Sequence, residues 1–333
     1  MASDLEQQHL FEGSPLPGWL PDETLFSLLS RHHRVSCNLK DSTTSQQLFG
    51  PRRKRCAPDF PNWIDSLVER TRGLLGSAED IIYQRTLLPF YLPYQTADEA
   101  LLCIAAMRGS GLGRLRPRLC RQTPNEQTVR PLKACAECMR DDLQDHQVAY
   151  WHVEHQLPGM LICLKHGGAL QQSAAPVTKH ASFSWYLPSD TKLVEPAWTV
   201  GDVGLSGGHL LQRVGQMALA LYRLPSRFHF DGVELERTYL QALRKLSGGL
   251  NPWEFSTMMS FAKMFQEHFA CLSPVYEFKA IHESINSAAK VLTMSLSPET
   301  CGRFAWNDLC VRVWLCQVIG AESSAKMNLD LRY

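Results

Sequence analysis

Apolar side chains recur at helical spacing along most of the chain, and in its first third the segments with this spacing are short. In one of them, residues 61–75, Ile64, Leu67 and Leu75 fall on one face. Short helices joined by brief turns are typical of a helix-turn-helix arrangement, but helical bundles that never touch DNA have the same pattern. Five helices are expected to begin at Asp22, Ser42, Pro61, Ser77 and Thr96, and the last is expected to end near Gly109.

Proline and glycine residues interrupt this pattern at residues 171–208, and we expect that segment to be irregular. Beyond it the spacing is helical again, and stripes of Leu, Met and Phe predict the buried faces of a helical bundle. Two of these helices are joined by a Gly- and Pro-containing turn at residues 248–252 and would also suit a second helix-turn-helix. The predicted helices are 209–224, 231–247, 253–270, 275–293 and 305–319.

The composition of the 333 residues is that of a globular protein, with 44% hydrophobic and 20% charged side chains and a mean hydropathy of −0.20. It excludes a chain that is disordered throughout. No run approaches the about 18 consecutive apolar residues of a membrane-spanning helix. The acidic start, Met1 to Glu6, is unlike a secretory signal. We therefore expect a cytoplasmic protein that acts without a membrane.

Positive charge is concentrated in residues 50–133, although the net charge of the whole chain is only +1. The low net charge argues against a protein that coats nucleic acid by bulk charge. Guanidinium groups in loops contact phosphate oxygens bidentately, so the basic block predicts DNA-contacting loops, while a solvated loop surface would show the same charges. The candidate DNA-binding residues are Arg52, Arg53, Lys54, Arg55, Arg114, Arg116 and Arg118.

Eleven cysteines in a chain without an export signal are expected to remain thiols, because a reducing cytoplasm prevents stable disulfides. Cys135-x-x-Cys138 and Cys163-x-x-His166 form two pairs of ligands that can point at one tetrahedral centre, which predicts a zinc ribbon with one Zn²⁺ ion. Four protein ligands leave no position for a reactive water, so the ion is expected to be structural. A redox-active dithiol is the alternative, but Pro131 precedes the motif and no parallel-strand pattern surrounds it.

The loop between the two ligand pairs carries two further histidines and two aromatic residues. His152 and His155 are either additional ligands or side chains that support the ribbon, and the filled tetrahedron favours the supporting role. Tyr150 and Trp151 are expected to pack inside the ribbon rather than to stack on nucleic-acid bases.

Several motifs occur together in an order that is typical of one protein family. They are Pro21-Asp22-Glu23, Leu48-Phe49-Gly50, Asp59-Phe60-Pro61, Thr86 to Tyr94, Cys135-x-x-Cys138, Tyr150-Trp151, His155 to Gly159 and Cys163-x-x-His166. With these motifs the sequence resembles, over residues 15–170, the TniQ family, the target-selection proteins of a class of bacterial transposons. It departs from the family pattern at Ala136, where a proline is common, and beyond about residue 180 only a helical pattern is shared.

The resemblance implies a non-catalytic adaptor with several partners. TniQ proteins link target DNA, or an RNA-guided CRISPR effector complex, to an AAA+ ATPase that recruits the transposase. Relatives that dock on guided complexes often act as homodimers, and a place in the bacterial cytoplasm, at the nucleoid when bound to DNA, is implied as well. The alternative is a protein-interaction module of the transposition complex that binds little DNA directly.

The residues themselves also argue against an enzyme. The sequence has no nucleophile elbow, no phosphate-binding glycine loop that ends in lysine, and no metalloprotease helix with paired histidines. Asp141, Asp142 and Asp145 lack the further acidic partner that a two-Mg²⁺ site would need.

The expected fold is therefore mainly α, in four parts. A helix-turn-helix-like helical domain spans residues 1–125, and a small structural zinc ribbon spans residues 126–180. An irregular linker at 181–208 leads to a C-terminal helical bundle at 209–333.

Overall fold

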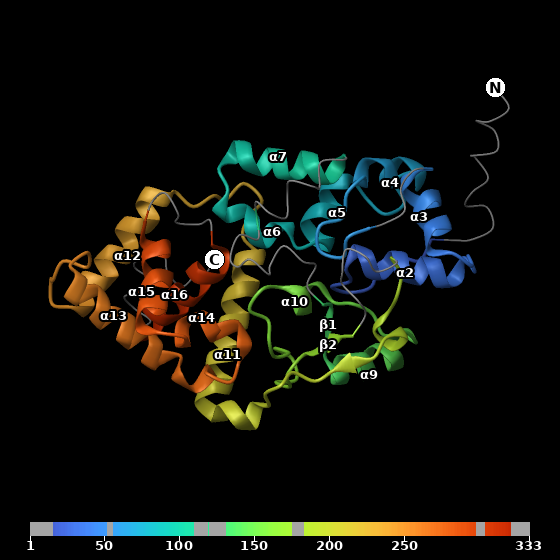
Figure 1. Ribbon diagram of the computed structural model, residues 1–333. Helices are drawn as coiled ribbons and strands as arrows, with labels where there is room; N and C mark the ends of the chain where they lie inside the picture. Colours follow the sequence, from blue (N-terminus) through green and yellow to red (C-terminus); the bar gives the residue numbers. More distant parts are fainter. Residues whose placement is uncertain are drawn as a thin grey trace.

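A computed structural model describes residues 16–51, 56–109, 119, 131–174, 183–297 and 304–320. The chain is mainly helical, as the apolar spacing predicts, and its strands are short (Figure 1). In Figure 1 the N-terminal helices lie at the upper right, the strands with α9 and α10 lie below them, and the C-terminal helices lie at the left. None of the described helices is long and apolar enough to cross a membrane.

Side-chain caps fix the starts of several N-terminal helices. The capping box predicted at Thr96 forms with Glu99, and Ser77 forms another with Asp80. In each box two backbone N–H groups that a helix start leaves unpaired gain an acceptor. The elements are α2 (Leu25–Val35), α3 (Asp41–Phe49), α4 (Ile64–Arg70), α5 (Ala78–Arg85), α6 (Leu88–Tyr91), η2 (Leu92–Tyr94) and α7 (Ala97–Arg108).

Two expected helix starts in this region were wrong by two or three residues. Asp22 does not cap α2, because Thr24 does so with its side-chain oxygen, and Asp22 has a backbone φ of 51°. The helix expected at residues 61–75 begins only at Ile64, since Trp63 takes the left-handed conformation with φ 63°. In both cases tertiary contacts hold the chain before the helix. The spacing of apolar residues gives no information on such contacts.

The middle of the chain forms a small antiparallel sheet with the strand order β1-β2-β3. In its register Lys133 lies opposite Gln172, and Gln172 lies opposite Val194. The elements are β1 (Lys133–Ala134), α9 (Ala136–His146), α10 (Val153–Gln156), β2 (Gln171–Ser173), η4 (Pro188–Asp190) and β3 (Leu193–Val194).

The segment 181–208, which was expected to be an irregular linker, is packed and partly regular in its described residues. It supplies β3, and its side chains Trp185 and Trp198 are buried. Helix α11 (Val200–Tyr222) begins at residue 200 rather than 209, because a capping box at Thr199 starts it. Gly204 interrupts it with a φ of 65° and a ψ of −178°, so a short first segment precedes the longer one, while Gly207 and Gly215 permit close packing against Leu272 and Met160.

The C-terminal helices form a bundle that encloses a second part of the core. Helices α12 and α13 both pack against α15, so this pair is part of the bundle. The elements are α12 (Gly232–Leu246), α13 (Phe255–His268), η5 (Ala270–Leu272), η6 (Tyr276–Phe278), α14 (Lys279–His282), α15 (Ile285–Leu296) and α16 (Ala305–Val318).

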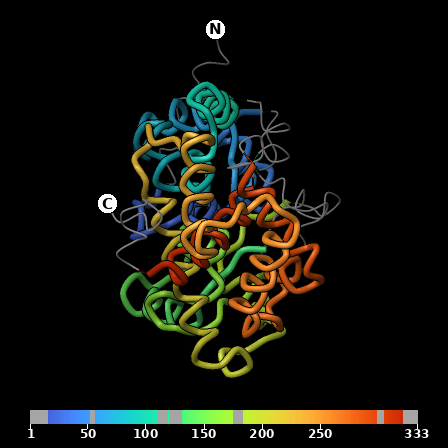
Figure 2. The backbone as a smooth tube through the Cα atoms, turned by 90° about the vertical axis from the view of Figure 1, so that its left-hand side faces the viewer, coloured from blue at the N-terminus to red at the C-terminus, as the bar shows by residue number. Residues whose placement is uncertain are grey.

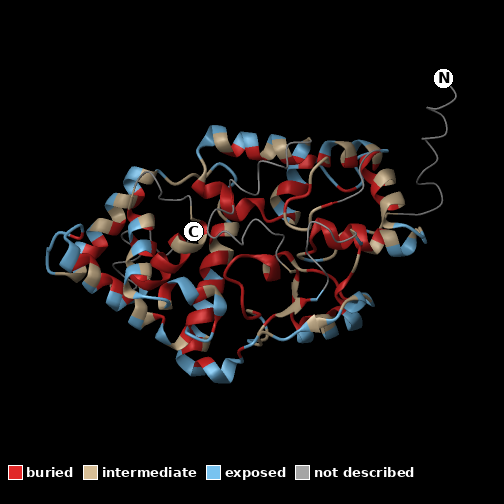
Figure 3. Cartoon of the chain, viewed as in Figure 1, coloured by how far each residue is buried: buried red, intermediate tan, exposed pale blue. Residues whose placement is uncertain are grey.

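One hydrophobic core runs from the N-terminal helices into the C-terminal bundle (Figure 3). Helix α11 packs against both α6 and α16, and the two parts still lie against each other in the view turned by 90° (Figure 2). The backbone N–H of Phe230 donates to the Pro93 carbonyl at 2.7 Å. The Tyr94 hydroxyl donates to Asp308 Oδ2 at 2.5 Å. The C-terminal helices are therefore joined to the N-terminal ones by polar as well as apolar contacts.

Candidate metal centre

Two of the four predicted ligands come from the first turn of α9. Cys135 is the N-cap residue of this helix and Cys138 is its third residue, so both sulfurs lie near the helix N-terminus. The partial positive charge of a helix N-terminus favours the thiolate form of a cysteine. Both side chains are buried.

The other two ligands come from a tight turn later in the chain. The N–H of Cys163 donates to the Gly168 carbonyl at 2.8 Å, and the N–H of Gly167 donates to the Cys163 carbonyl at 2.7 Å. Gly167 has φ 72°, a conformation that glycine adopts without strain. The turn thereby brings His166 back over Cys163, with its Nδ1 atom 3.6 Å from the cysteine Sγ.

The four donor atoms are arranged as a tetrahedral metal site requires. Sγ of Cys135 and Nδ1 of His166 are 3.6 Å apart, and Sγ of Cys138 lies 3.3 Å from the same nitrogen. The Sγ atoms of Cys138 and Cys163 are 3.6 Å apart, and all four donors lie within 4.8 Å of one another. A zinc ion with bonds of about 2.3 Å to sulfur and about 2.0 Å to nitrogen would separate its ligands by roughly 3.5–3.8 Å. This set therefore fits a metal ion.

The thiols also affect one another's protonation. Hydrogen bonds among the three thiols lower the pKa of Cys135, and those with Cys135 raise the pKa values of Cys138 and Cys163. A thiolate is the form of cysteine that binds a metal, so binding of an ion would release protons from Cys138 and Cys163.

Asp141 contacts the histidine ligand, His166, at the ring nitrogen that does not face the cysteines. Its carboxylate lies 3.3 Å from Nε2 of His166 and 2.5 Å from Nζ of Lys165. The hydrogen bond from Lys165 lowers the pKa of Asp141, so the carboxylate is charged at neutral pH. A carboxylate on Nε2 favours the tautomer that leaves Nδ1 free to bind the metal. From the sequence Asp141 was considered only for Mg²⁺, although its place three residues after Cys138 on the same helix was a usable signal.

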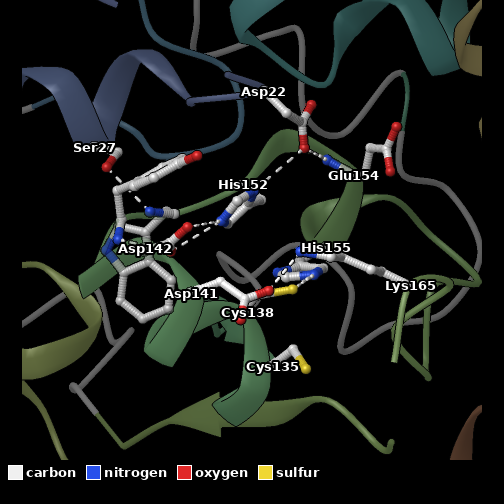
Figure 4. A network of polar contacts seen from close by, with 12 residues as sticks. Asp22, Ser27, Cys135, Cys138, Asp141, Asp142, His152, Glu154, His155 and Lys165 are labelled. Carbon is white, nitrogen blue, oxygen red and sulfur yellow. Dashed lines mark hydrogen bonds and ion pairs between the residues drawn. The ribbon is translucent and has the colours of Figure 1, made fainter. Parts of the chain in front are cut away.

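Of the two histidines of the intervening loop, His155 lies against the cluster, in agreement with its predicted supporting role (Figure 4). His155 is buried, and its Nε2 lies 3.7 Å from Sγ of Cys138. Burial lowers the pKa of His155 to about 3, so its imidazole is neutral. His152 lies farther out, with its Nε2 3.0 Å from Asp142. The group of residues close enough to hold a metal comprises only the four predicted ligands within the described ranges.

The N-terminal motif with Asp22 is hydrogen bonded to this loop (Figure 4). The carbonyl of Asp22 accepts from the N–H of Val153 at 2.7 Å, and its side chain accepts from the N–H of Glu154 at 3.0 Å. Ser27 Oγ accepts from the N–H of Trp151 at 3.0 Å. Desolvation by burial raises the pKa of Asp22 to about 6. The loop between the two ligand pairs is thus hydrogen bonded to the start of α2 and to the residues just before it.

Gln156 pairs the loop with strand β1. Its Oε1 accepts from the backbone N–H of Lys133 at 2.8 Å, and its Nε2 donates to the Lys133 carbonyl at 2.9 Å. The amide side chain thereby replaces a neighbouring strand at the edge of the sheet. The sequence pattern predicts no role for this glutamine, because its partner lies 23 residues away.

The remaining residues of the loop have packing roles. Trp151 and Tyr150 are buried, as predicted, and the indole N–H of Trp151 donates to the Tyr186 carbonyl at 2.9 Å. Gly159 has φ 83° and faces the C-terminal bundle, where an added Cβ would lie 2.7 Å from a methyl group of Leu309. The loop therefore connects the metal centre to α16.

The predicted DNA contacts lie in segments that the structure does not describe. Among the acidic residues considered for Mg²⁺, Asp141 is engaged by Lys165 and His166, and Asp142 is engaged by His152. The residues outside the described ranges are Arg52, Arg53, Lys54, Arg55, Arg114, Arg116 and Arg118.

Comparison with known proteins gives one family. Residues 15–170 match the family model described as TniQ. No curated protein matches the chain. The matched residues include every ligand of the candidate metal centre and the Asp22 and Gln156 side chains that hold its loop.

Proposed function

The chain belongs to the TniQ family through residues 15–170, and from this membership we propose that it is a non-catalytic adaptor for target selection by a bacterial transposon. Membership implies a transposon-associated role in target selection. In the finer form that we propose, the protein links target DNA or an RNA-guided CRISPR effector complex to an AAA+ ATPase, which recruits the transposase. The observation that carries the proposal is that the Asp22 motif is hydrogen bonded to the loop between the two ligand pairs, whose four predicted ligands meet in one cluster.

We propose zinc as the ion of this cluster and a structural role for it. Three sulfurs and one imidazole are the ligands that closed zinc sites use. The ligands come from α9 and from a turn 25 residues later. A bound ion would therefore hold together two segments that contain little regular secondary structure of their own. The bound metal would supply rigidity, while Asp141 and His155 orient and enclose the ligands.

The metal assignment is tested with the full-length protein. We expect elemental analysis of the wild type to give about one zinc per chain. Cys163→Ser should lose both this zinc and the near-ultraviolet circular dichroism signal of the folded protein. Cys37→Ser is the matched control, because Cys37 is exposed and outside the cluster. A purified chain without stoichiometric metal, or equal metal in Cys163→Ser, contradicts the assignment.

For direct DNA binding we propose the basic residues outside the described ranges. Four alanines at residues 52–55 should weaken DNA binding and flatten its salt dependence, by roughly one unit of slope for each phosphate that these side chains neutralise. The control removes the same charge elsewhere, with alanine at the exposed residues Lys192, Arg237, Lys279 and Lys290. Equal slopes for both variants and the wild type would remove residues 52–55 from the interface.

The net charge of +1 favours a second candidate, a protein-interaction module that binds little DNA. Gel shifts with random and candidate target duplexes at two salt concentrations separate the two. Binding of the purified AAA+ ATPase without any DNA shift would favour the module, and a salt-dependent shift would favour the DNA-binding adaptor. We also propose that the adaptor is a homodimer, and a measurement of its molar mass in solution tests this.

A further inference from the structure

Helix α7 carries apolar side chains on its outer as well as on its inner side. The inner side packs against α4 and α5. On the outer side Leu101 and Leu102 are 65% and 59% exposed. A surface helix ordinarily carries polar residues at such positions, so the outer side of α7 is suited to contact a partner. The buried residues of the helix are Ala100, Cys103 and Met107, and its exposed apolar residues are Ala97, Leu101, Leu102 and Ala105.

The position of α7 makes its outer side accessible to a large partner. The helix lies along the upper edge of the molecule in Figure 1, and it is again at the top in the view turned by 90° (Figure 2). Helices α4 and α5, which support it, lie below it in Figure 1. A flat or convex partner could therefore approach α7 without a movement of the rest of the chain.

The order of the exposed residues on α7 indicates which partner fits. Asp98, Leu101, Ala105 and Arg108 are all exposed and follow one another at spacings of three, four and three residues, which places them in one stripe along the helix. In an antiparallel pair of α7 helices, Leu101 lies opposite Ala105 of the second copy, so a large side chain meets a small one. Asp98 then lies opposite Arg108 of the second copy at both ends. A parallel pair would instead place like charges opposite each other.

The apolar middle of the stripe is expected to supply most of the affinity. Arg108 Nε already donates to Asp65 at 2.9 Å, and Glu79 lies 3.9 Å from the same guanidinium. The Arg108 side chain nevertheless stays 44% exposed, and a guanidinium has five N–H donors, so it can also meet a carboxylate of a second copy. The charged ends therefore set the orientation of the pair more than its strength.

We propose that two copies of this chain associate through the outer sides of their α7 helices, antiparallel and related by a two-fold axis near Cys103. Such a contact is isologous, because each residue pair occurs twice. The proposal rests on the homodimer of the proposed function and names the surface that forms it. A helix of 12 residues is about 18 Å long, and one pair of such helices buries less than the roughly 800 Å² per partner of a stable complex. We therefore expect a weak dimer that depends on concentration.

The test measures the molar mass of the full-length chain by sedimentation equilibrium at several concentrations. The wild type should approach twice the 37.7 kDa of one chain as its concentration rises. Leu101→Glu should raise the dissociation constant of the dimer by at least about tenfold, because a carboxylate would be placed in the apolar middle of the contact at two symmetric positions. Leu250→Glu is the matched control, because Leu250 is 56% exposed in the turn between α12 and α13. This control should dimerise like the wild type.

A mixture of two variants separates a lost interface from a lost fold. Leu101→Lys should be as monomeric as Leu101→Glu, but an equimolar mixture of the two should dimerise. The reason is that the two-fold axis brings position 101 of both copies close together, where opposite charges attract and like charges repel. A mixture that stays monomeric overturns the proposal.

Asp98→Lys tests the antiparallel orientation. It places two cations opposite each other only in the antiparallel pair, so the dissociation constant should rise about threefold to thirtyfold. An unchanged dissociation constant contradicts this orientation.

Failure of the α7 interface and failure of the homodimer give different results. A wild-type dimer whose dissociation constant is the same in Leu101→Glu overturns the interface and leaves the homodimer in place. A wild type that is monomeric at every concentration overturns both and leaves the outer side of α7 to a different protein. Neither result depends on the proposed role in target selection.

Discussion

At the scale of single residues, the contact of Asp141 with His166 makes a prediction about metal affinity. Because the carboxylate orients the imidazole from its Nε2 side, Asp141→Asn should weaken zinc binding by about 10- to 100-fold while the four ligands remain. Competition with a chromophoric chelator measures the change. Asp145→Asn on the same helix is the control, since Asp145 is exposed. Equal affinities for the two variants would remove Asp141 from the metal centre.

Asp22 makes a prediction about pH. Its pKa is raised to about 6 by burial, above the ordinary value near 3.8, so the fold prefers its protonated form. The resulting stability is fully present below pH 4 and is lost as the pH rises through 6. Asp22→Asn stays neutral and keeps an acceptor for the Glu154 N–H, so its free energy of unfolding relative to wild type should rise between pH 4 and 7, by less than about 3 kcal/mol. Urea unfolding at several pH values measures this difference, and a difference independent of pH would contradict the assignment.

At the scale of elements, Gly159 couples the loop of the metal centre to α16. An added Cβ would lie 2.7 Å from Leu309 and 3.1 Å from Val214, and its φ of 83° is unfavourable for alanine. Gly159→Ala should therefore lower the free energy of unfolding by about 1–3 kcal/mol. Gly168→Ala is the control, because a Cβ there meets nothing within 4 Å. Chemical denaturation measures both variants, and equal stability would show that the loop can move away from α16.

The sequence predicts those elements whose cause is local. The capping box at Thr96 and the ligand spacing around Cys135 lie within a few residues, so both could be read before the structure was known. Helix α11 was expected to begin late, because glycines that serve close packing resemble a linker when their partners are unknown. The Asp22 contact joins residues 132 positions apart and Gln156 pairs with a strand 23 positions away, distances at which a spacing argument has no information.

At the scale of the whole molecule, a buried polar network joins the matched region to the C-terminal bundle. Asp308 accepts hydrogen bonds from Tyr94, Tyr239 and Arg312, and the Arg312 guanidinium lies 4.3 Å from the centre of the Phe230 ring. Both members of the Asp308–Arg312 pair are 1% exposed. Removing one charge from a fully buried pair leaves the other uncompensated, at a cost of about 3–5 kcal/mol.

This network predicts that the metal centre and the C-terminal helices unfold together. In Asp308→Asn the thermal midpoint should fall, and it should fall equally for the far-ultraviolet signal of the helices and for the absorbance of a Co²⁺-substituted metal centre. Glu283→Gln removes one exposed negative charge from the same bundle and should leave both midpoints in place. Because Tyr94 lies in the TniQ region and Asp308 in α16, a helical signal that melts while the Co²⁺ absorbance persists would mean that the two regions are separate folding units.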